Sequence, residues 1–506
     1  MKYLRKRWIL VCILVFSFIL RTFQLANIPH GFFCDEASIG YNAYKVGTTG
    51  KDEYGVTLPF FTQSFGDYRH TLAIYSDIPF IWIFGLNETG VRLQSVFFGM
   101  ISILVLYFFV KEVTSTKYGL IAAFIAGITP WLLHYNRTGF EFSSYAALFS
   151  LTVFLFHRIN RNPNYIIPSF ITLGITIYTY QPSKLMVPLL LLGIAIIYRK
   201  KLIDGLKNTV MGLIIFLLIC IPFFNIISSG NATSRFNQVS IFSSKLTLEN
   251  VIIKSVNQYF FQLSPKIMLM GENTFINRHF AGGLLPLLPI TLFFSLIGII
   301  FLFYNFKERT SQLLLFWLFI YPIGGMLVAD PPYTSRSIIG APLAIILSVL
   351  GIYSILRLVK NKNTIIVIWG IIMILILFNF SYFLKFYFLR YPLYSSDFWG
   401  WQYGPSEIMK YFLSEKDNYD ELFMSGEYNA GQIFLVFYDP ENKCLSKCKM
   451  GDFYTQPNII NTNKKQIFAI SPAYLEKSKI KNRFIVKKTI YYPNNHVAFF
   501  MGEIKP

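Results

Sequence analysis

Long apolar stretches alternate with short polar segments up to about residue 384 of the chain. About eleven of these stretches approach the roughly twenty apolar residues that a helix needs to cross a bilayer. The pattern therefore predicts an all-α, polytopic membrane bundle over residues 1–390. The first stretch has no small-residue cleavage site after it, so we expect it to be retained as a helix. The predicted spans are 8–27, 91–110, 118–135, 141–156, 165–182, 185–198, 208–227, 282–304, 311–329, 337–356 and 364–384.

Beyond residue 390 the long apolar stretches give way to short patterned segments. Aromatic and β-branched residues fall there in short runs bounded by turn residues, which is typical of strands. Residues 391–506 are therefore predicted to form a small α/β domain, in which Cys444 and Cys448 could close a disulfide loop. We expect a helix at 404–413 and strands at 421–425, 466–471, 484–492 and 496–504, the last two joined as a hairpin by Pro493-Asn494-Asn495.

Composition agrees with a membrane protein, because 54% of the side chains are apolar, 14% are charged and the mean hydropathy is +0.47. So little polar surface excludes a soluble globular protein. If the N-terminus is cytoplasmic, the inner segments contain seventeen basic and three acidic residues, which follows the positive-inside rule. The net charge of +20 is thus a topology signal, and nucleic acid is a poor partner. This orientation puts the first outer loop, residues 28–90, and the C-terminal domain outside.

Ionisable residues avoid the centres of the predicted spans and gather at their outer ends. Ion-coupled transporters place such groups at mid-membrane depth, where charge is costly and therefore functional. The distribution instead favours a cavity at the outer membrane boundary. Such a cavity would hold a charged lipid head group while the lipid tail stays in the bilayer.

A carboxylate pair, Asp35-Glu36, lies just past the outer end of the first span. A carboxylate there could act as general base on an acceptor hydroxyl, or could help to hold a divalent cation such as Mg²⁺ or Mn²⁺. The structural alternative is that Asp35 caps a helix beginning at Glu36, whose charge is favourable in a first turn. The two roles are compatible, and no His or Cys cluster demands a metal.

The segment Asp67-Tyr68-Arg69-His70 offers an acid, a guanidinium and an imidazole within one turn. Asp67 is a second candidate catalytic acid. Arg69 and His70 could neutralise a phosphate leaving group, because arginine offers a rigid fork of donors to phosphate oxygens. A solvated amphipathic surface helix would present the same residues.

Arg137, Glu141 and Arg336 each lie at an outer edge of the membrane. The two arginines could bind the phosphate of a lipid substrate and Glu141 could line the substrate pocket. Arginines that only anchor a span by snorkelling to the membrane surface would occupy the same positions.

Residues 178–184 join two spans on the outer side. Lys184 is a candidate phosphate ligand, and Tyr178 and Tyr180 are candidate pocket residues. Interfacial tyrosines are more often belt residues, so the role as a ligand rests on Lys184.

The acidic pair of the first outer loop is followed by a motif that opens the second span, Phe84-Gly-Leu-Asn-Glu-Thr-Gly-Val-Arg92-Leu-Gln-Ser95. This combination resembles the GT-C membrane glycosyltransferases, and among them the protein O-mannosyltransferases and the lipid A aminoarabinose transferases. The resemblance covers roughly residues 1–390. It implies that Asp35 is the base or the acceptor-orienting group, supported by Glu36. Relatives keep a second acid or a phosphate-binding His or Lys before a proline near position 71, where this chain has Thr71.

The resemblance implies an enzyme that takes one mannose-like sugar from a polyprenyl-phosphate carrier, with inversion, to an acceptor on the outer face. The alternative is a flippase or transporter of a lipid-linked glycan, which would share the spans and the arginines. Charge-free span centres favour the enzyme, and an oligosaccharide ligase of related architecture would differ in its donor. The acceptor can be a protein, a lipid or a cell-wall glycan. With no organelle signal, we expect a multi-pass protein of the plasma membrane.

Overall fold

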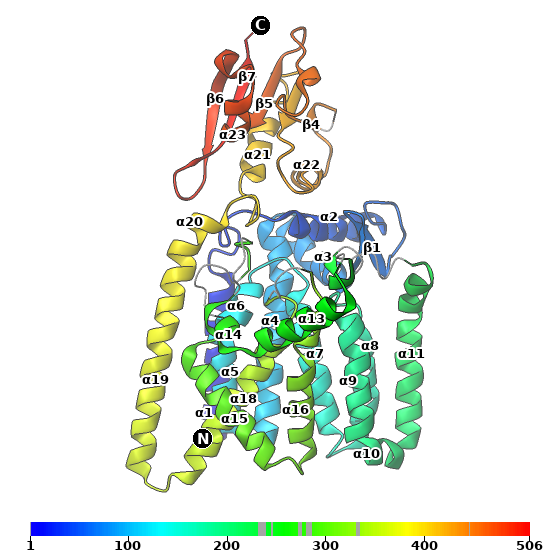
Figure 1. The fold of residues 1–506 in the computed structure, drawn as a ribbon, viewed down its shortest axis with the longest axis vertical. Coiled ribbons are helices and arrows are strands. Elements are labelled where there is room, and N and C mark those ends of the chain that lie inside the picture. The colour runs from blue at the N-terminus through cyan, green and yellow to red at the C-terminus, as the bar shows by residue number, and fades with distance from the viewer. Residues whose placement is uncertain are drawn as a thin grey trace.

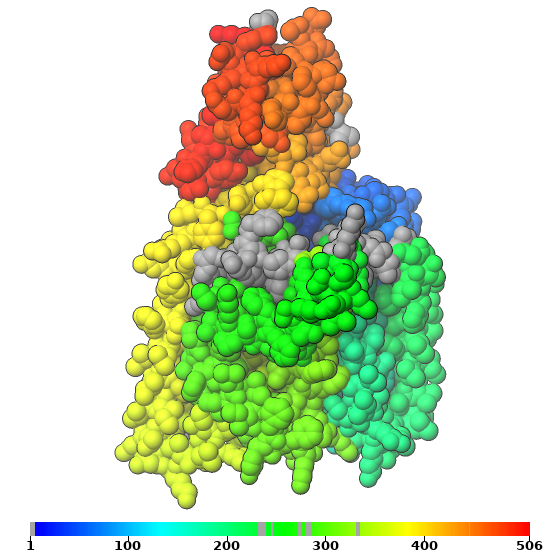
Figure 2. All heavy atoms as spheres, in the orientation of Figure 1, coloured from blue at the N-terminus to red at the C-terminus, as the bar shows by residue number. Residues whose placement is uncertain are grey.

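The structure is a computed structural model and describes residues 2–230, 239–243, 246–271, 276–279, 286–329, 334–444 and 446–505, with side chains from residue 6 onward. A broad body of roughly parallel helices bears a narrow lobe built around a sheet (Figure 1). The space-filling view shows the same two parts as a wide base and a slender projection (Figure 2). The N-terminus lies toward the end of the body that points away from the lobe, and the C-terminus lies at the tip of the lobe (Figure 1).

Each predicted apolar run overlaps a helix of the body. The helices are α1 (Lys2–Thr22), α4 (Glu88–Val113), α5 (Thr116–Ile128) with α6 (Pro130–Tyr135), α7 (Phe142–Arg158), α8 (Ile166–Thr176), α9 (Ser183–Ile197), α11 (Leu206–Ser228), α15 (Pro289–Tyr304), α16 (Arg309–Ile320), α18 (Gly340–Leu358) and α19 (Lys362–Lys385). Part of the run predicted at 282–304 lies outside the described residues.

Among the described residues, four helices are long and apolar enough to cross a membrane by length and composition alone. They are Glu88–Val113, Leu206–Ser228, Gly340–Leu358 and Lys362–Ser395. The apolar helices Leu72–Phe84, Thr116–Ile128, Ser183–Ile197 and Pro289–Tyr304 are shorter. The total of about eleven spans therefore stays a prediction.

Helices α15 and α18 approach each other backbone to backbone. A Cβ on Gly298 would lie 2.0 Å from the carbonyl oxygen of Leu347, and one on Gly351 would lie 2.0 Å from that of Phe294. Inside a bilayer apolar side chains gain nothing by leaving lipid for protein, so close packing over small residues is what holds neighbouring helices together. These two glycines thus set the spacing of this helix pair.

The segment between α1 and α4, predicted as the first outer loop, forms helices and a hairpin on the end of the body that faces the lobe (Figure 1). Helix α2 (Cys34–Thr49) is followed by strands β1 (Phe61–Ser64) and β2 (Asp67–His70) and by helix α3 (Leu72–Phe84). The helical turn considered for residues 67–70 is therefore wrong, because they pair as a strand with β1. Phe65 and Gly66 between the strands have φ of 53° and 79°, and two positive φ values in a two-residue turn close a hairpin.

Short helices complete the body and lead to the lobe. They are α10 (Arg199–Asp204), α13 (Leu248–Leu263), α14 (Pro265–Met270), α17 (Ile323–Met326) and α20 (Tyr391–Ser395).

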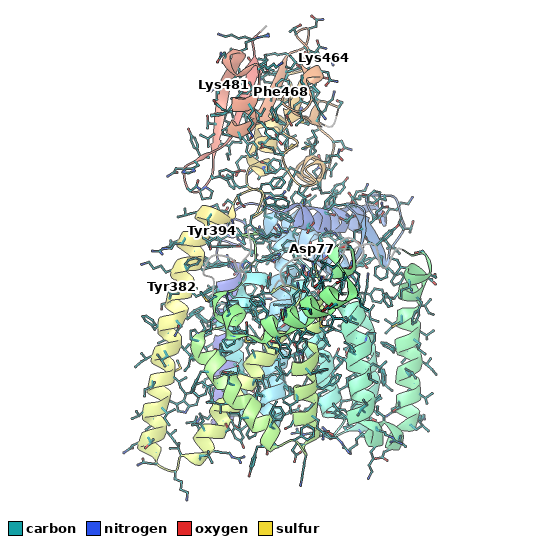
Figure 3. The ribbon with its side chains drawn as sticks, viewed as in Figure 1. Asp77, Tyr382, Tyr394, Lys464, Phe468 and Lys481 are labelled. Carbon is teal, nitrogen blue, oxygen red and sulfur yellow. A yellow bond between two sulfur atoms is a disulfide. The ribbon has the colours of Figure 1, made fainter. Side chains whose placement is uncertain are left out.

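The C-terminal lobe, residues 405–505, contains a five-stranded sheet in the order β4-β3-β5-β7-β6. Strands β3, β4 and β5 are parallel, whereas β7 is antiparallel to both β5 and β6. Lys464 lies nearer the tip and Phe468 nearer the body, so β5 and its parallel neighbours run toward the body (Figure 3). The elements are α21 (Pro405–Glu415), β3 (Glu421–Met424), α22 (Gln432–Tyr438), β4 (Cys448–Met450), β5 (Gln466–Ile470), α23 (Pro472–Lys477), β6 (Phe484–Tyr491) and β7 (Val497–Ile504).

The four predicted strands and the predicted helix of the lobe are present, and Cys444 and Cys448 form a disulfide. The short strand β4 and the helices α22 and α23 were not predicted. The boundary proposed between residues 390 and 391 stays a prediction.

A buried ion pair fixes the beginning of α2. Arg92 donates to both carboxylate oxygens of Glu36, at 3.0 and 3.2 Å, and neither side chain is exposed. Glu36 also accepts from the backbone N–H groups of Phe33 and Gly139, and Arg92 also donates to four carbonyls of residues 25–31. A buried pair is tolerable only when further hydrogen bonds offset the cost of desolvation, as they do here.

Two more buried arginines donate hydrogen bonds to the carbonyls at the C-terminal ends of helices. Arg137 donates to the carbonyls of Leu20 and Phe23 at the end of α1, both at 2.7 Å. Arg21 donates to the carbonyls of residues 126 and 127 near the end of α5, at 3.2 and 2.9 Å. The last carbonyls of a helix lack partners within it and carry partial negative charge, so a guanidinium both satisfies and stabilises them.

Replacing Glu36 by Gln should destabilise the protein by about 3–5 kcal/mol, because the Arg92 guanidinium would remain buried without its counter-charge. Thermal unfolding of the purified protein in detergent measures this. The matched control is Glu308→Gln, which removes an exposed carboxylate that makes no ion pair among the described residues. Equal melting temperatures for the two variants would contradict a stabilising role for the ion pair between Glu36 and Arg92.

Candidate functional site

Asp35 projects from the first turn of α2 and is not needed to cap it. The helix begins at Cys34 with Phe33 as N-cap, and Glu36 accepts from the Phe33 N–H at 3.1 Å. Asp35 instead accepts a hydrogen bond from Nη2 of Arg69 at 2.5 Å. The structural alternative for Asp35, capping a helix that starts at Glu36, is therefore wrong.

A cavity of about 680 Å³ opens beside Asp35. Most of the polar residues singled out in the sequence share its lining, although they come from distant segments of the chain. The ionisable residues and the tyrosine on its wall are Asp35, Asp67, Arg69, His70, Glu141, Tyr180, Lys184, Arg278, His279 and Arg336. One cavity thus combines carboxylates with several cations.

The β1–β2 hairpin is docked onto the segment that precedes α9. The backbone N–H of Leu72 donates to the carbonyl of Tyr178 at 3.2 Å, and Nε2 of Gln181 donates to the carbonyl of Tyr68 at 3.0 Å. Lys184 lies over the ring of Phe61, with Nζ 5.9 Å from the centroid. These contacts bring β2, and with it Arg69 and His70, beside Lys184.

Arg336 joins the same wall through α17. A Cβ on Gly324 would lie 2.9 Å from the carbonyl oxygen of Arg336 and 3.4 Å from Cβ of Pro182, so the three backbones meet there. Lys184 follows Pro182 by two residues. Lys184 and Arg336, which the sequence placed at the ends of different spans, therefore lie on the same side of the cavity.

Arg278 and His279 belong to the lining but were not predicted as site residues. The Arg278 guanidinium stacks 3.9 Å from the centroid of the Phe33 ring, and its Nη1 donates to the carbonyl of Trp399 at 2.8 Å. His279 Nδ1 lies 3.2 Å from the hydroxyl of Tyr135. Arg278 was visible in the sequence only as one more charge at an outer span end, with no motif around it.

The charge of the cavity comes from arginine and lysine and not from histidine. Burial, and then the neighbouring Lys184, hold the pKa of His70 well below its usual range. Burial, and then Arg278 and other nearby cations, do the same to the pKa of His279. Burial by itself would lower the pKa of Arg69, but the negative charges of Asp35 and Glu141 raise it above its usual range.

Three predicted site residues lie outside the lining. Glu36 forms an ion pair with Arg92, and Arg137 donates its hydrogen bonds to the carbonyls at the end of α1. The hydroxyl of Tyr178 donates to the carbonyl of Ile219 at 2.6 Å. Their positions favour structural roles over contact with a substrate.

The segment that leads into the C-terminal lobe, residues 396–404, completes the start of α2. Oε1 of Gln402 accepts from the backbone N–H of Cys34 at 2.9 Å, and its Nε2 lies 3.4 Å from the carbonyl of Asn429 in the lobe. The fit at Gly31 is tight, because a Cβ there would lie 2.3 Å from the carbonyl oxygen of Trp401. Asn429 itself lines the cavity. The lobe therefore contributes to the same site as α2.

The described residues contain no group of three or more His, Cys, Asp and Glu side chains that could hold a metal ion. The sequence suggested a divalent cation such as Mg²⁺ or Mn²⁺ at the pair Asp35-Glu36, but Glu36 is enclosed in its ion pair with Arg92. The carboxylates that line the cavity are Asp35, Asp67 and Glu141, and a divalent cation stays a prediction.

Comparison with known proteins identifies the fold. The sequence profile of the family described as dolichyl-phosphate-mannose-protein mannosyltransferase matches residues 79–225. A comparison with curated proteins finds no match. The oligosaccharyltransferase of Archaeoglobus fulgidus in its apo form superposes with a TM-score of 0.56 at 12% identity, covering 98% of this chain and 74% of that one. ArnT from Cupriavidus metallidurans bound to undecaprenyl phosphate superposes with a TM-score of 0.54 at 11% identity, covering 98% of this chain and 97% of that one.

The chain has the GT-C glycosyltransferase fold. The resemblance drawn from the acidic pair and the motif at residues 84–95 is thereby confirmed. The superposed structures also extend over the C-terminal lobe, since 98% of the chain is covered. The carboxylate of Asp35 lies beside the cavity in this chain, and the roles of individual residues stay predictions.

Gln402→Leu should lower stability by about 1–3 kcal/mol, because it leaves the buried Cys34 N–H without an acceptor. Gln402→Glu keeps an acceptor oxygen for the Cys34 N–H but sets a second carboxylate oxygen against the carbonyl of Asn429, so it should lower stability while protecting the Cys34 N–H from exchange. Hydrogen exchange of the peptide containing residues 33–36 reports the change locally. Unaltered exchange in Gln402→Leu would show that this hydrogen bond does not hold α2.

Proposed function

We propose that the protein is a membrane glycosyltransferase that moves a single, mannose-like sugar from a polyprenyl-phosphate carrier to an acceptor. The transfer takes place at the membrane face that bears the C-terminal lobe. The observation that carries the proposal is one cavity in which the Asp35 carboxylate is combined with Lys184, Arg278 and Arg336. A base and a set of cations are what displacement of a phosphate requires.

Asp35 is proposed as the general base. It takes the proton of the acceptor hydroxyl while the oxygen attacks the anomeric carbon, and the bond from that carbon to the phosphate oxygen breaks. The phosphate leaves with the electron pair, and the cations stabilise its charge. One displacement inverts the anomeric centre. Arg69 holds the Asp35 carboxylate in place through their ion pair.

Three comparisons support a lipid-linked donor. The matched family profile is described by mannose transfer from dolichyl phosphate to protein. The ArnT structure contains undecaprenyl phosphate, and a further structure of AglB from Archaeoglobus fulgidus, 12% identical with a TM-score of 0.52, contains an inhibitory peptide and a dolichol-phosphate. From these we infer a polyprenyl phosphate donor for this chain.

Location and acceptor are part of the proposal. A membrane location is supported by the four long apolar helices and by the fold. The distribution of basic residues favours an N-terminus in the cytoplasm and the lobe outside, and we propose the plasma membrane as the location. The acceptor is a hydroxyl of a protein, a lipid or a cell-wall glycan, and these classes are separated by identifying the product.

Asp35→Asn should reduce sugar transfer by about 100- to 10,000-fold, the usual contribution of a general base, while leaving the fold intact. The assay follows radiolabelled mannose from polyprenyl-phosphate-mannose into product in membranes containing the chain. Binding of polyprenyl phosphate to the variant should be retained, which separates loss of chemistry from loss of the donor. Normal turnover by Asp35→Asn would remove Asp35 from the mechanism, and glycolipid movement without product would favour the flippase.

Affinity for the sugar donor should stay constant between pH 6 and pH 7 and weaken as the pH rises through about 8, because burial lowers the pKa of Lys184 to about 8. The donor phosphate is a diester and does not titrate there. The pKa values of His70 and His279 lie below the ordinary histidine value, so raising the pH in this range deprotonates neither. A Michaelis constant for the donor that rises with an apparent pKa near 6.5 would show that a charged histidine binds the phosphate.

A further inference from the structure

A second cavity, of about 350 Å³, lies at the end of the body that points away from the C-terminal lobe. It is formed where α9 passes into α10 and by the first residue of α16. Its lining consists of three isoleucines and three cations, Ile196, Ile197, Arg199, Lys200, Ile203 and Arg309. In Figure 1 the helix α10 marks this end of the body. We refer to these six residues as the basal groove.

Among the described residues, no acid forms an ion pair with the cations of the basal groove. Arg199, Lys200 and Arg309 form no ion pair with a described acid, and Arg309 also lies at the positive end of the α16 dipole. Asp204 and Glu308 belong to the same segments but do not line the groove. Arg158 and Arg161 behave differently, since both pair with Glu112, at 3.1 and 3.5 Å. The basal groove therefore presents three cations to an anion from outside the chain.

The groove is also open to an apolar ligand. Ile196 and Ile203 are 68% and 59% exposed, and Leu192, one turn before Ile196 on α9, is 57% exposed. A free inorganic anion would gain nothing from these side chains. A lipid would place its phosphate on the cations and its acyl chains along α9, which runs from the groove toward the middle of the body.

We propose that the basal groove binds the head group of an anionic glycerophospholipid, such as phosphatidylglycerol or cardiolipin. This site is separate from the cavity at Asp35, and it does not depend on the proposed transferase activity. Basic pockets between membrane helices are suited to such head groups because a phosphate can meet several cations at once. An occupied site would brace the junction of α9, α10 and α16.

The test compares lipid binding by the full chain in detergent, measured by native mass spectrometry during titration with phosphatidylglycerol and with phosphatidylcholine. The triple variant Arg199→Gln, Lys200→Gln, Arg309→Gln should lose about 10- to 100-fold in affinity for phosphatidylglycerol, while phosphatidylcholine stays weak for all proteins. The control triple variant Lys207→Gln, Lys307→Gln, Lys360→Gln removes the same charge from exposed positions outside the groove lining and should bind like the unaltered chain. Thermal unfolding confirms that both variants are folded.

Three outcomes would overturn the proposal. Equal losses in the two triple variants would show that only the overall surface charge attracts the lipid. Equal binding by all three proteins would place the lipid elsewhere. Displacement of phosphatidylglycerol by millimolar inorganic phosphate would show a site for free anions, in which the isoleucines have no part.

Discussion

The buried contact between Glu36 and Arg92 is the constraint on which the rest of the cavity at Asp35 depends. It combines one carboxylate and one guanidinium, both fully enclosed, with backbone groups from the turn before α2 and from the segment before α7. Two opposite charges in a dry interior are stable only when every donor and acceptor has a partner. Their shared network fixes where α2 begins, and Asp35, the residue before Glu36, is held on the wall of the cavity as a consequence.

The same principle divides the arginines at the end of the body that faces the lobe into two groups. Arg92, Arg137 and Arg21 are buried and donate to backbone carbonyls or Glu36, so their charge stabilises the fold. Arg278 and Arg336 lie on the cavity wall. Since phosphate and a helix C-terminus both attract a guanidinium, the distinction depends on which of them is within reach.

Much of the fold could be predicted from the sequence, because a bilayer leaves helices as the only way to bury long apolar segments. The four predicted strands of the lobe could be recognised from short runs of aromatic and β-branched residues bounded by turn residues. The β1–β2 hairpin was missed because its turn is Phe65-Gly66, which lacks the usual Asn-Gly signal. In the site, Asp35 and Lys184 were found from their position at span ends. The contribution of Gln402 could not be predicted, because its partner lies 368 residues away in the sequence.

Asp35, Lys184 and Arg336 line one cavity, which we propose receives the phosphate of a lipid carrier. An experimental structure of the chain with bound undecaprenyl phosphate tests this most directly. We expect the phosphate to lie in that cavity, within hydrogen-bonding distance of Lys184 or Arg336 and near Asp35. A phosphate bound outside the cavity, or an Asp35 side chain turned away from it, would contradict the account.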